Sequence, residues 1–221
     1  MDEQMARWND EMYLKHPTPY HGLAGRIEYA RVAAVVRLAG VKPGDAVLDL
    51  GCGAGHVLVA LPRCRRKVGL DISERSLADA RTRAAEHGEA EIEFGHFDGN
   101  DPLPYQPGEF DVIVCAEVLE HVPEPRRLVE GIHTIATPAT RVVVTVPIER
   151  PKLLVKKALR AVGLMRLLFP GIEPGFSEGH LHCFSKQMLR DVTRGLFAIR
   201  RLRNVWGCHC AALLSKAQAA S

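Results

Sequence analysis

The sequence lacks the features that mark secreted proteins, membrane-spanning proteins and small proteins stabilised by zinc or disulfides. No apolar segment follows a basic start, so we expect no secretory signal. No uncharged apolar run approaches the length that spans a bilayer. The six cysteines are scattered without a C-x-x-C pair, which argues against a zinc ribbon or a disulfide framework. A reducing cytoplasm is therefore the expected compartment.

A strong charge imbalance is also missing. The chain has 29 Lys and Arg against 26 Asp and Glu, and its net charge of +3 is too small to indicate a nucleic acid partner. The basic residues are dispersed and form no aromatic-basic stripe. No internal repeat or low-complexity segment is evident. The length of 221 residues and the hydrophobic content of 47% fit one α/β domain over residues 1–221.

What the chain does contain is a glycine loop within residues 46–56, Ala-Val-Leu-Asp-Leu-Gly-Cys-Gly-Ala-Gly-His. The apolar run ending at Leu50 predicts a buried strand, three alternating glycines follow, and residues 57–61 have an apolar helical pattern. Glycine is needed where the backbone turns with positive φ or passes close to a ligand. This order of strand, glycine loop and helix predicts a nucleotide-binding turn whose helix N-terminus faces the ligand.

Two features separate this loop from the dinucleotide fingerprint. His56 stands where G-x-G-x-x-G needs its last Gly or Ala. Asp49 lies at the strand end, where a carboxylate repels a pyrophosphate but suits a cationic ligand with an amino group. Residues 47–55 resemble motif I of the class I S-adenosylmethionine (SAM)-dependent methyltransferases, and SAM carries both a sulfonium and an α-ammonium group. A glycine turn without a ligand is the alternative.

The next strand also ends in an acid. Residues 67–71 predict a buried strand that ends at Asp71, and Ser73 then caps a helix over residues 74–87. An acid at this position faces the ribose hydroxyls in both SAM and NAD enzymes, so Asp71 is the predicted ribose ligand. The alternative is that Asp71 only serves the dipole of the helix that follows.

A third strand, over residues 91–97, leads to Asp98. In the methyltransferases that the chain resembles, an acid here contacts the adenine amino group and its apolar neighbour lies against the ring. The resemblance implies these roles for Asp98 and Phe97. The full set of cofactor-binding residues that it implies is Asp49, Gly51, Cys52, Gly53, Gly55, Asp71, Ile72, Phe97, Asp98 and Glu117.

A fourth strand, over residues 110–115, runs into Glu-Val-Leu-Glu-His-Val-Pro at 117–123. This segment resembles motif IV of small-molecule methyltransferases, especially of the ubiquinone-biosynthesis O-methyltransferase type. It lies at the carboxyl end of a central strand, where α/β sheets bind ligands. In that type the matching residues have been associated with a divalent cation, which makes Glu117, Glu120 and His121 plausible ligands. The alternative is that they only hold the loop, and we assign no metal.

The remaining segments complete the expected fold. A helix over 25–40 precedes the first strand, a fifth strand covers 141–146, and strands over 197–206 and 208–215 form a final hairpin. We predict an α/β fold with a Rossmann-like, doubly wound, seven-stranded sheet. The sheet is mostly parallel with an antiparallel last strand, and a helical insert precedes strand 6. The resemblance implies that residues 1–24 form an N-terminal lid over the cofactor.

The expected helical insert covers residues 148–180, on the substrate side of the site. Within it, residues 151–169 are amphipathic at helical spacing, with apolar residues on one side and Lys and Arg on the other. Such a helix can cap the active site, or it can lie in a membrane interface and admit a lipid-like substrate. Under both alternatives the insert determines which substrate is accepted.

Methyl transfer from SAM is an in-line displacement, for which the protein mainly positions the two reactants. A hydroxyl acceptor must also lose a proton, and histidine is the side chain whose pKa best suits that task. His121, after the fourth strand, and His180, before a Phe-Ser turn, are the candidate bases. For His182 we expect a structural role.

The expected function is SAM-dependent methyl transfer to a hydroxyl, phenol or carboxyl oxygen of a small molecule, with S-adenosylhomocysteine as product. An N-methyltransferase is the nearest alternative, although residues 115–118 lack the Asp/Asn-Pro-Pro-Tyr motif of one such group. An NAD(P)-dependent oxidoreductase would use the same sheet, but the missing glycine and Asp49 argue against it. A catalytically silent SAM-binding subunit is the remaining alternative, and the oligomeric state is not readable.

Overall fold

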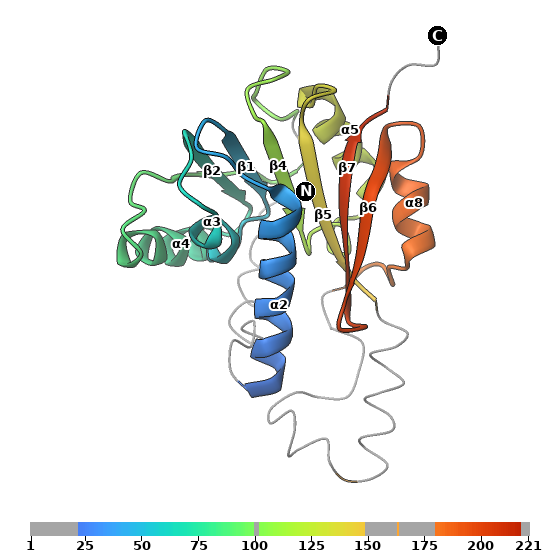
Figure 1. Ribbon diagram of the computed structural model, residues 1–221, viewed down its shortest axis with the longest axis horizontal. Coiled ribbons are helices and arrows are strands. Elements are labelled where there is room, and N and C mark those ends of the chain that lie inside the picture. Colours follow the sequence, from blue (N-terminus) through green and yellow to red (C-terminus); the bar gives the residue numbers. More distant parts are fainter. Residues whose placement is uncertain (1–21, 100–101, 149–162, 164–179, 218–221) are drawn as a thin grey trace.

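The computed structural model describes residues 22–99, 102–148, 163 and 180–217 (Figure 1). Its centre is a seven-stranded sheet with the strand order β3-β2-β1-β4-β5-β7-β6. The strands are β1 (Ala46–Leu50), β2 (Arg66–Asp71), β3 (Glu93–His96), β4 (Val112–Ala116), β5 (Arg141–Pro147), β6 (Phe197–Val205) and β7 (His209–Lys216). The helices are α2 (Gly22–Ala39), α3 (His56–Ala60), α4 (Glu74–Glu86), α5 (Pro125–Ile135) and α8 (Lys186–Thr193).

The first five strands pair in parallel, and β7 pairs antiparallel with both β5 and β6. The central strands β1 and β4 are continuous apolar runs that are buried almost throughout, as expected for strands covered on both faces. The predicted seven-stranded, mostly parallel α/β sheet is therefore confirmed.

Helices cover both faces of the sheet. On one face, Val35 of α2, Val57 of α3 and Leu77 of α4 share a core cluster with Val47 of β1. On the other face, α5 and α8 pack in a second cluster with the alternate residues of the same strands. Figure 1 shows α2 in front of the sheet and α5 behind it. This is the doubly wound arrangement that the sequence predicts.

The carboxyl ends of the five parallel strands meet at one edge of the sheet. Because β7 is antiparallel, it begins at this same edge, where His209 pairs with Pro147 at the end of β5. The glycine loop after β1, the acid at the end of β2 and the segment after β4 therefore all reach one edge. This edge holds the candidate site.

Most element boundaries agree with the sequence predictions within two residues. The helix predicted at 74–87 begins after Ser73, whose side chain accepts the N–H of Ser76. The third strand is shorter than predicted, because the N–H of Ile92 closes a turn by donating to the carbonyl of Glu89. One boundary is wrong: residues 22–24, assigned to the lid, belong to α2.

The lid predicted at 1–24 and the insert predicted at 148–180, with its amphipathic segment 151–169, fall almost wholly outside the described residues. Over the ranges that the structure does describe, none of the helices combines the length and the apolar character needed to cross a membrane.

Candidate active site

The three glycines of the loop have positive φ angles of 71°, 50° and 76° at Gly51, Gly53 and Gly55, and each meets different surroundings. A Cβ at Gly51 would lie 2.3 Å from Cγ2 of Val118, and one at Gly55 would lie 3.2 Å from Cβ of Ala80. A Cβ at Gly53 would meet nothing within 4 Å among the described residues. Gly51 and Gly55 therefore serve packing, and Gly53 faces open space beside the loop.

Asp49 lies at the base of this loop with 1% of its surface exposed. Neither of its carboxylate oxygens has a hydrogen-bond partner in the described part of the chain. Burial raises the pKa of this carboxyl group to about 8, with the charge of Arg31 acting to lower the pKa and that of Asp71 to raise it. Burying a carboxyl group without a hydrogen-bond partner costs folding free energy, which makes this position a candidate ligand-binding site.

Arg31 is a member of this site that the sequence did not indicate. It lies on α2 with 7% of its surface exposed, and its Nε donates to Oε2 of Glu28 at 2.8 Å. From the sequence, a basic residue in an amphipathic helix is expected on the solvent-exposed face. The only available signal is an i, i+3 acid–base pair, which is common on exposed helices.

Asp71 ties the glycine loop to the start of α4. One carboxylate oxygen accepts the N–H of Gly53 at 2.7 Å, and the other accepts the N–H of Ser73 at 2.9 Å. These contacts match the structural role weighed for Asp71. They do not exclude the ribose role, because each carboxylate oxygen can accept a second hydrogen bond.

The other predicted cofactor residues differ in how far their side chains are buried. Cys52 is buried, its Sγ lies 2.9 Å from the position of a Cβ at Gly69, and burial raises the pKa of its thiol, so only its backbone can meet a ligand. Ile72, Phe97 and Asp98 are half-buried. The N–H of Phe97 donates to the carbonyl of Asp71 at 2.9 Å, which places the third strand end beside the second.

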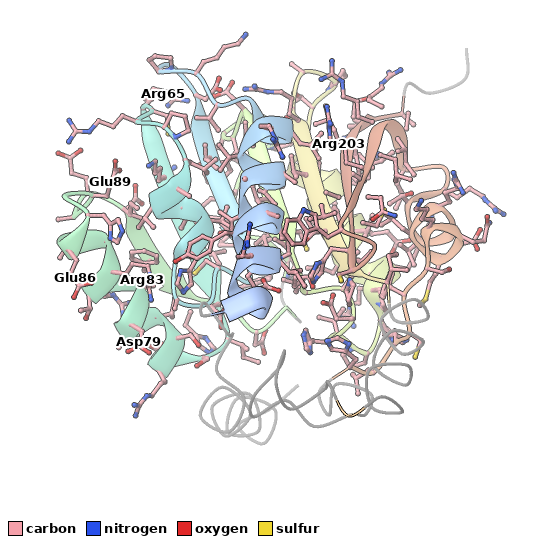
Figure 2. All side chains as sticks on the ribbon, turned by 60° about the horizontal axis from the view of Figure 1, so that its bottom comes forward. Arg65, Asp79, Arg83, Glu86, Glu89 and Arg203 are labelled. Carbon is pink, nitrogen blue, oxygen red and sulfur yellow. The ribbon has the colours of Figure 1, made fainter. Side chains whose placement is uncertain are left out.

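His56, at the place of the missing glycine, opens α3. Desolvation, with the nearby charges of Arg83 and Arg31, lowers the pKa of His56 to about 4, so its imidazole is neutral near pH 7. Arg83 extends from α4, where Figure 2 shows it along one helix with Asp79 and Glu86, and its Nε donates to the carbonyl of Ala54 at 2.8 Å. This contact fixes the C-terminal part of the glycine loop.

A second group of polar side chains follows β4. One ligand atom each from Glu120, His121 and His180 lies within 4.8 Å of the others. Glu120 is fully buried, whereas the side chain of His121 is 36% exposed, and the two imidazole rings stand edge to face with centroids 4.9 Å apart. The structure therefore brings the two candidate bases together. The same three groups form a plausible site for a divalent cation.

Backbone contacts hold the two segments of this group together. The carbonyl of Glu120 accepts the N–H of Leu181 at 2.8 Å, and Nε2 of His182 lies 3.0 Å from the carbonyl of Val122. His182 thus has the structural role expected for it.

Glu117 is not part of the Glu120–His121–His180 group. Its Oε1 accepts the hydroxyl of Thr145 at 2.9 Å, and its Oε2 lies 3.2 Å from Nε2 of His209. Of the three residues weighed as metal ligands, the structure gathers two and adds His180 in place of Glu117. His209 itself was not singled out by the sequence, where it reads as an ordinary position in a terminal strand.

Two comparisons of the sequence agree with this geometry. A family profile described as "Methyltransferase domain" matches residues 41–165. The ubiquinone biosynthesis O-methyltransferase of Pseudomonas aeruginosa is 32% identical over 162 residues, which make up 73% of this chain and 66% of that protein. The chain thus matches just under two thirds of the length of this relative.

Solved structures share the fold at low sequence identity. A magnesium protoporphyrin IX methyltransferase from Synechocystis with bound S-adenosylhomocysteine has a TM-score of 0.66 and 19% identity, covering 97% of this chain and 94% of that one. The [4+2]-cyclase SpnF has a TM-score of 0.65 and 18% identity, covering 87% and 81%. At such identities the likeness shows the fold alone, and a fold hosts many activities.

Proposed function

The chain belongs to the class I SAM-dependent methyltransferases, whose cofactor is SAM, and from this premise we propose that it transfers a methyl group to an oxygen atom of a small molecule. The observation that carries the proposal is the buried carboxyl group of Asp49, which has no hydrogen-bond partner among the described residues. A cation at the glycine loop compensates this group, and the α-ammonium of SAM is such a cation. A pyrophosphate there would instead place negative charge beside this carboxyl group and would not compensate it.

The other residues of the loop fit the same cofactor. Gly53 leaves open space above the loop, and we propose that Asp71 takes the ribose hydroxyls there. Phe97 and Asp98, at the end of β3, are proposed to contact the adenine ring and its amino group. Gly51, Gly55, Cys52, Ile72 and Glu117 keep their predicted place around the cofactor as part of this proposal.

On the acceptor side, the cofactor supplies a methyl group that its positive sulfur already activates. The protein must orient the acceptor oxygen towards that methyl group and remove the proton of a hydroxyl. We propose that His121 accepts this proton, because its imidazole is partly exposed at the edge and lies against His180. Oε1 of Glu120 lies 4.0 Å from Nε2 of His121, so a carboxyl group adjoins the proposed base.

A divalent cation is an alternative means to the same end. Glu120, His121 and His180 would hold it, and it would lower the pKa of a bound acceptor hydroxyl. In that case the two imidazoles act as ligands and do not take the proton. Turnover that survives a chelator favours the histidine base, and turnover that is lost and then restored by a divalent cation favours the metal.

The acceptor is proposed to be a small hydroxylated or lipid-like molecule rather than a nucleic acid, in line with the mild net charge. An N-methyltransferase stays the nearest alternative, and product analysis separates the two. The cytoplasmic location and a peripheral membrane contact through residues 151–169 stay predictions.

Calorimetric titration with S-adenosylhomocysteine, with NADH as control ligand, tests the proposal. Binding of S-adenosylhomocysteine alone supports it, and Asp71→Ala then weakens the affinity while Glu86→Ala, at the far end of α4, does not. Binding of NADH alone would overturn the proposal in favour of an oxidoreductase. Binding of neither ligand would favour a protein that depends on a partner for cofactor binding, or one that is silent.

A further inference from the structure

Glu117, the residue that directly follows β4, has an unusual backbone conformation. Its φ angle is 58°, and among the described residues only Trp206 is a second non-glycine residue with positive φ. A side chain with a Cβ disfavours this left-handed region, so the conformation persists only where the surroundings hold it. The contacts of Glu117 therefore indicate what holds the segment after β4.

Two neighbouring strands supply these contacts. The N–H of Glu117 donates to the carbonyl of Thr145 at 3.0 Å, and its Oε1 accepts the hydroxyl of the same residue at 2.9 Å. Its Oε2 lies 3.2 Å from Nε2 of His209. Thr145 is fully buried and His209 is 3% exposed, whereas the side chain of Glu117 is 21% exposed, so both partners of Glu117 are shielded from water and Glu117 is shielded in part.

His209 also connects Glu117 to helix α2. Its Nε2 lies 3.7 Å from Oε1 of Glu28, and Oε2 of Glu28 accepts Nε of Arg31 at 2.8 Å. Two carboxylates from different elements thus face one imidazole nitrogen, which must carry its proton to satisfy them. Without that N–H the two carboxylates would face each other and repel.

The residues after Glu117 reach both halves of the candidate site. Val118 lies against Gly51, where an added Cβ would come within 2.3 Å of its Cγ2. Glu120 and His121 stand next to His180. The conformation of Glu117 therefore sets the position of the segment 117–123 relative to both the glycine loop and the acceptor side.

We infer that His209 is a positioning residue that holds Glu117 in its left-handed conformation and so fixes the segment 117–123 between the cofactor and the acceptor. The relevance of this role to catalysis rests on the proposed function. His209 acts from β7, through its contact with Glu117. Its loss lets Glu117 relax towards negative φ, which moves Val118 and His121 together.

A double-variant cycle tests this inference, because it separates an effect through Glu117 from a general loss of structure. The four proteins are the wild type, His209→Phe, Glu117→Gly and the double variant, each titrated with S-adenosylhomocysteine well below its unfolding temperature. Phenylalanine removes the N–H and keeps a flat, though larger, ring, and glycine adopts positive φ without strain. His209→Gln keeps an N–H, and His133→Phe, a half-buried histidine of α5 that faces Phe197, is the matched control.

We expect His209→Phe to raise the dissociation constant about tenfold, and His209→Gln to restore most of the affinity. In the Glu117→Gly background the added His209→Phe should change the dissociation constant less than about twofold. His133→Phe should leave the affinity at the wild-type value. An equal loss in both backgrounds, or a change in unfolding temperature alone, would overturn the inference.

A ligand-free measurement separates this inference from the proposed function. The ring signals of His121 in NMR spectra, assigned with a His121→Gln variant, should shift in His209→Phe and stay in place in His133→Phe. If the wild type binds no S-adenosylhomocysteine, the proposed function fails, and the NMR shift still decides whether His209 positions the segment. Unshifted His121 signals in His209→Phe would overturn the positioning role.

Discussion

A single carboxyl group, that of Asp49, links stability to binding at the scale of one residue. Its pKa in the folded chain is raised to about 8 from its ordinary value of 3.8, because burial disfavours the charged form. The folded chain therefore holds this proton where the unfolded chain has lost it. The contribution of this proton to the free energy of unfolding is complete below the pKa that Asp49 has in the unfolded chain. It is lost as the pH rises towards about 8.

From this sign we predict that Asp49→Asn is more stable than the wild type at alkaline pH and binds S-adenosylhomocysteine much more weakly. The amide removes the charge that would otherwise be buried, and with it the partner of the ligand's ammonium group. Urea unfolding at about pH 5 and about pH 9 should show the stability difference growing with pH. A difference that shrinks as the pH rises would contradict the assigned pKa.

The affinity for the cofactor should depend on pH through the same group. Pairing with an ammonium requires the ionised carboxylate, so binding below about pH 8 must release a proton. We expect the affinity for S-adenosylhomocysteine to rise by up to about tenfold per pH unit below that value and then to level off. Calorimetry in two buffers of different ionisation enthalpy measures the proton release directly, and no release near neutral pH would contradict the prediction.

The two imidazoles at the acceptor side give a third prediction at this scale. His121→Gln should lower turnover by about 100-fold or more, because a positioned base typically contributes that much, and should leave binding of S-adenosylhomocysteine unchanged. His180→Gln should have a smaller effect if His180 only orients the base. Equal, full activity in both variants would remove the pair from the mechanism.

At the scale of elements, the glycine loop combines two kinds of glycine. Gly51→Ala should destabilise the fold by about 1–3 kcal/mol, because its Cβ would overlap Val118 in a packed region. Gly53→Ala should cost only the left-handed strain of about 1–2 kcal/mol and should instead reduce cofactor affinity, because its Cβ enters the open space. Unfolding curves and calorimetry on both variants measure the contrast. If both variants lost the same affinity for the cofactor and had the same stability, the proposed contrast between a packing glycine and a ligand-facing glycine would be wrong.

The same scale shows how far the sequence predicts the structure. Apolar runs predicted β1, β4 and β5, and the cap at Ser73 predicted the start of α4, because these signals are local in the chain. The contact between His209 and Glu117 joins residues far apart in the sequence through the pairing of β5 with β7. The partly ionic surroundings of Asp49 likewise depend on where α2 places Arg31. No local pattern encodes either contact, so neither was predicted.

For the whole molecule, the family sets the cofactor but the fold alone does not set the reaction, since a [4+2]-cyclase shares the fold. Cofactor binding should stabilise the entire folded chain. At a concentration about 100 times the dissociation constant, S-adenosylhomocysteine should add about 2.7 kcal/mol to the unfolding free energy. Thermal unfolding with and without the ligand measures this, with NADH as control, and a shift of equal size with NADH would indicate non-specific binding.

The place of β7 between β5 and β6 also affects how the protein is made on the ribosome. The glycine loop, the acids after β2 and β3, and the segment after β4 are all synthesised before residue 209. Until β7 inserts, Glu117 lacks its contact with His209, and β5 presents an unpaired edge. A nascent chain can therefore build most of the cofactor loop before it can complete the acceptor side. If His209 positions Glu117 as inferred, the segment 117–123 reaches its final position only after β7 has left the ribosome and paired with β5.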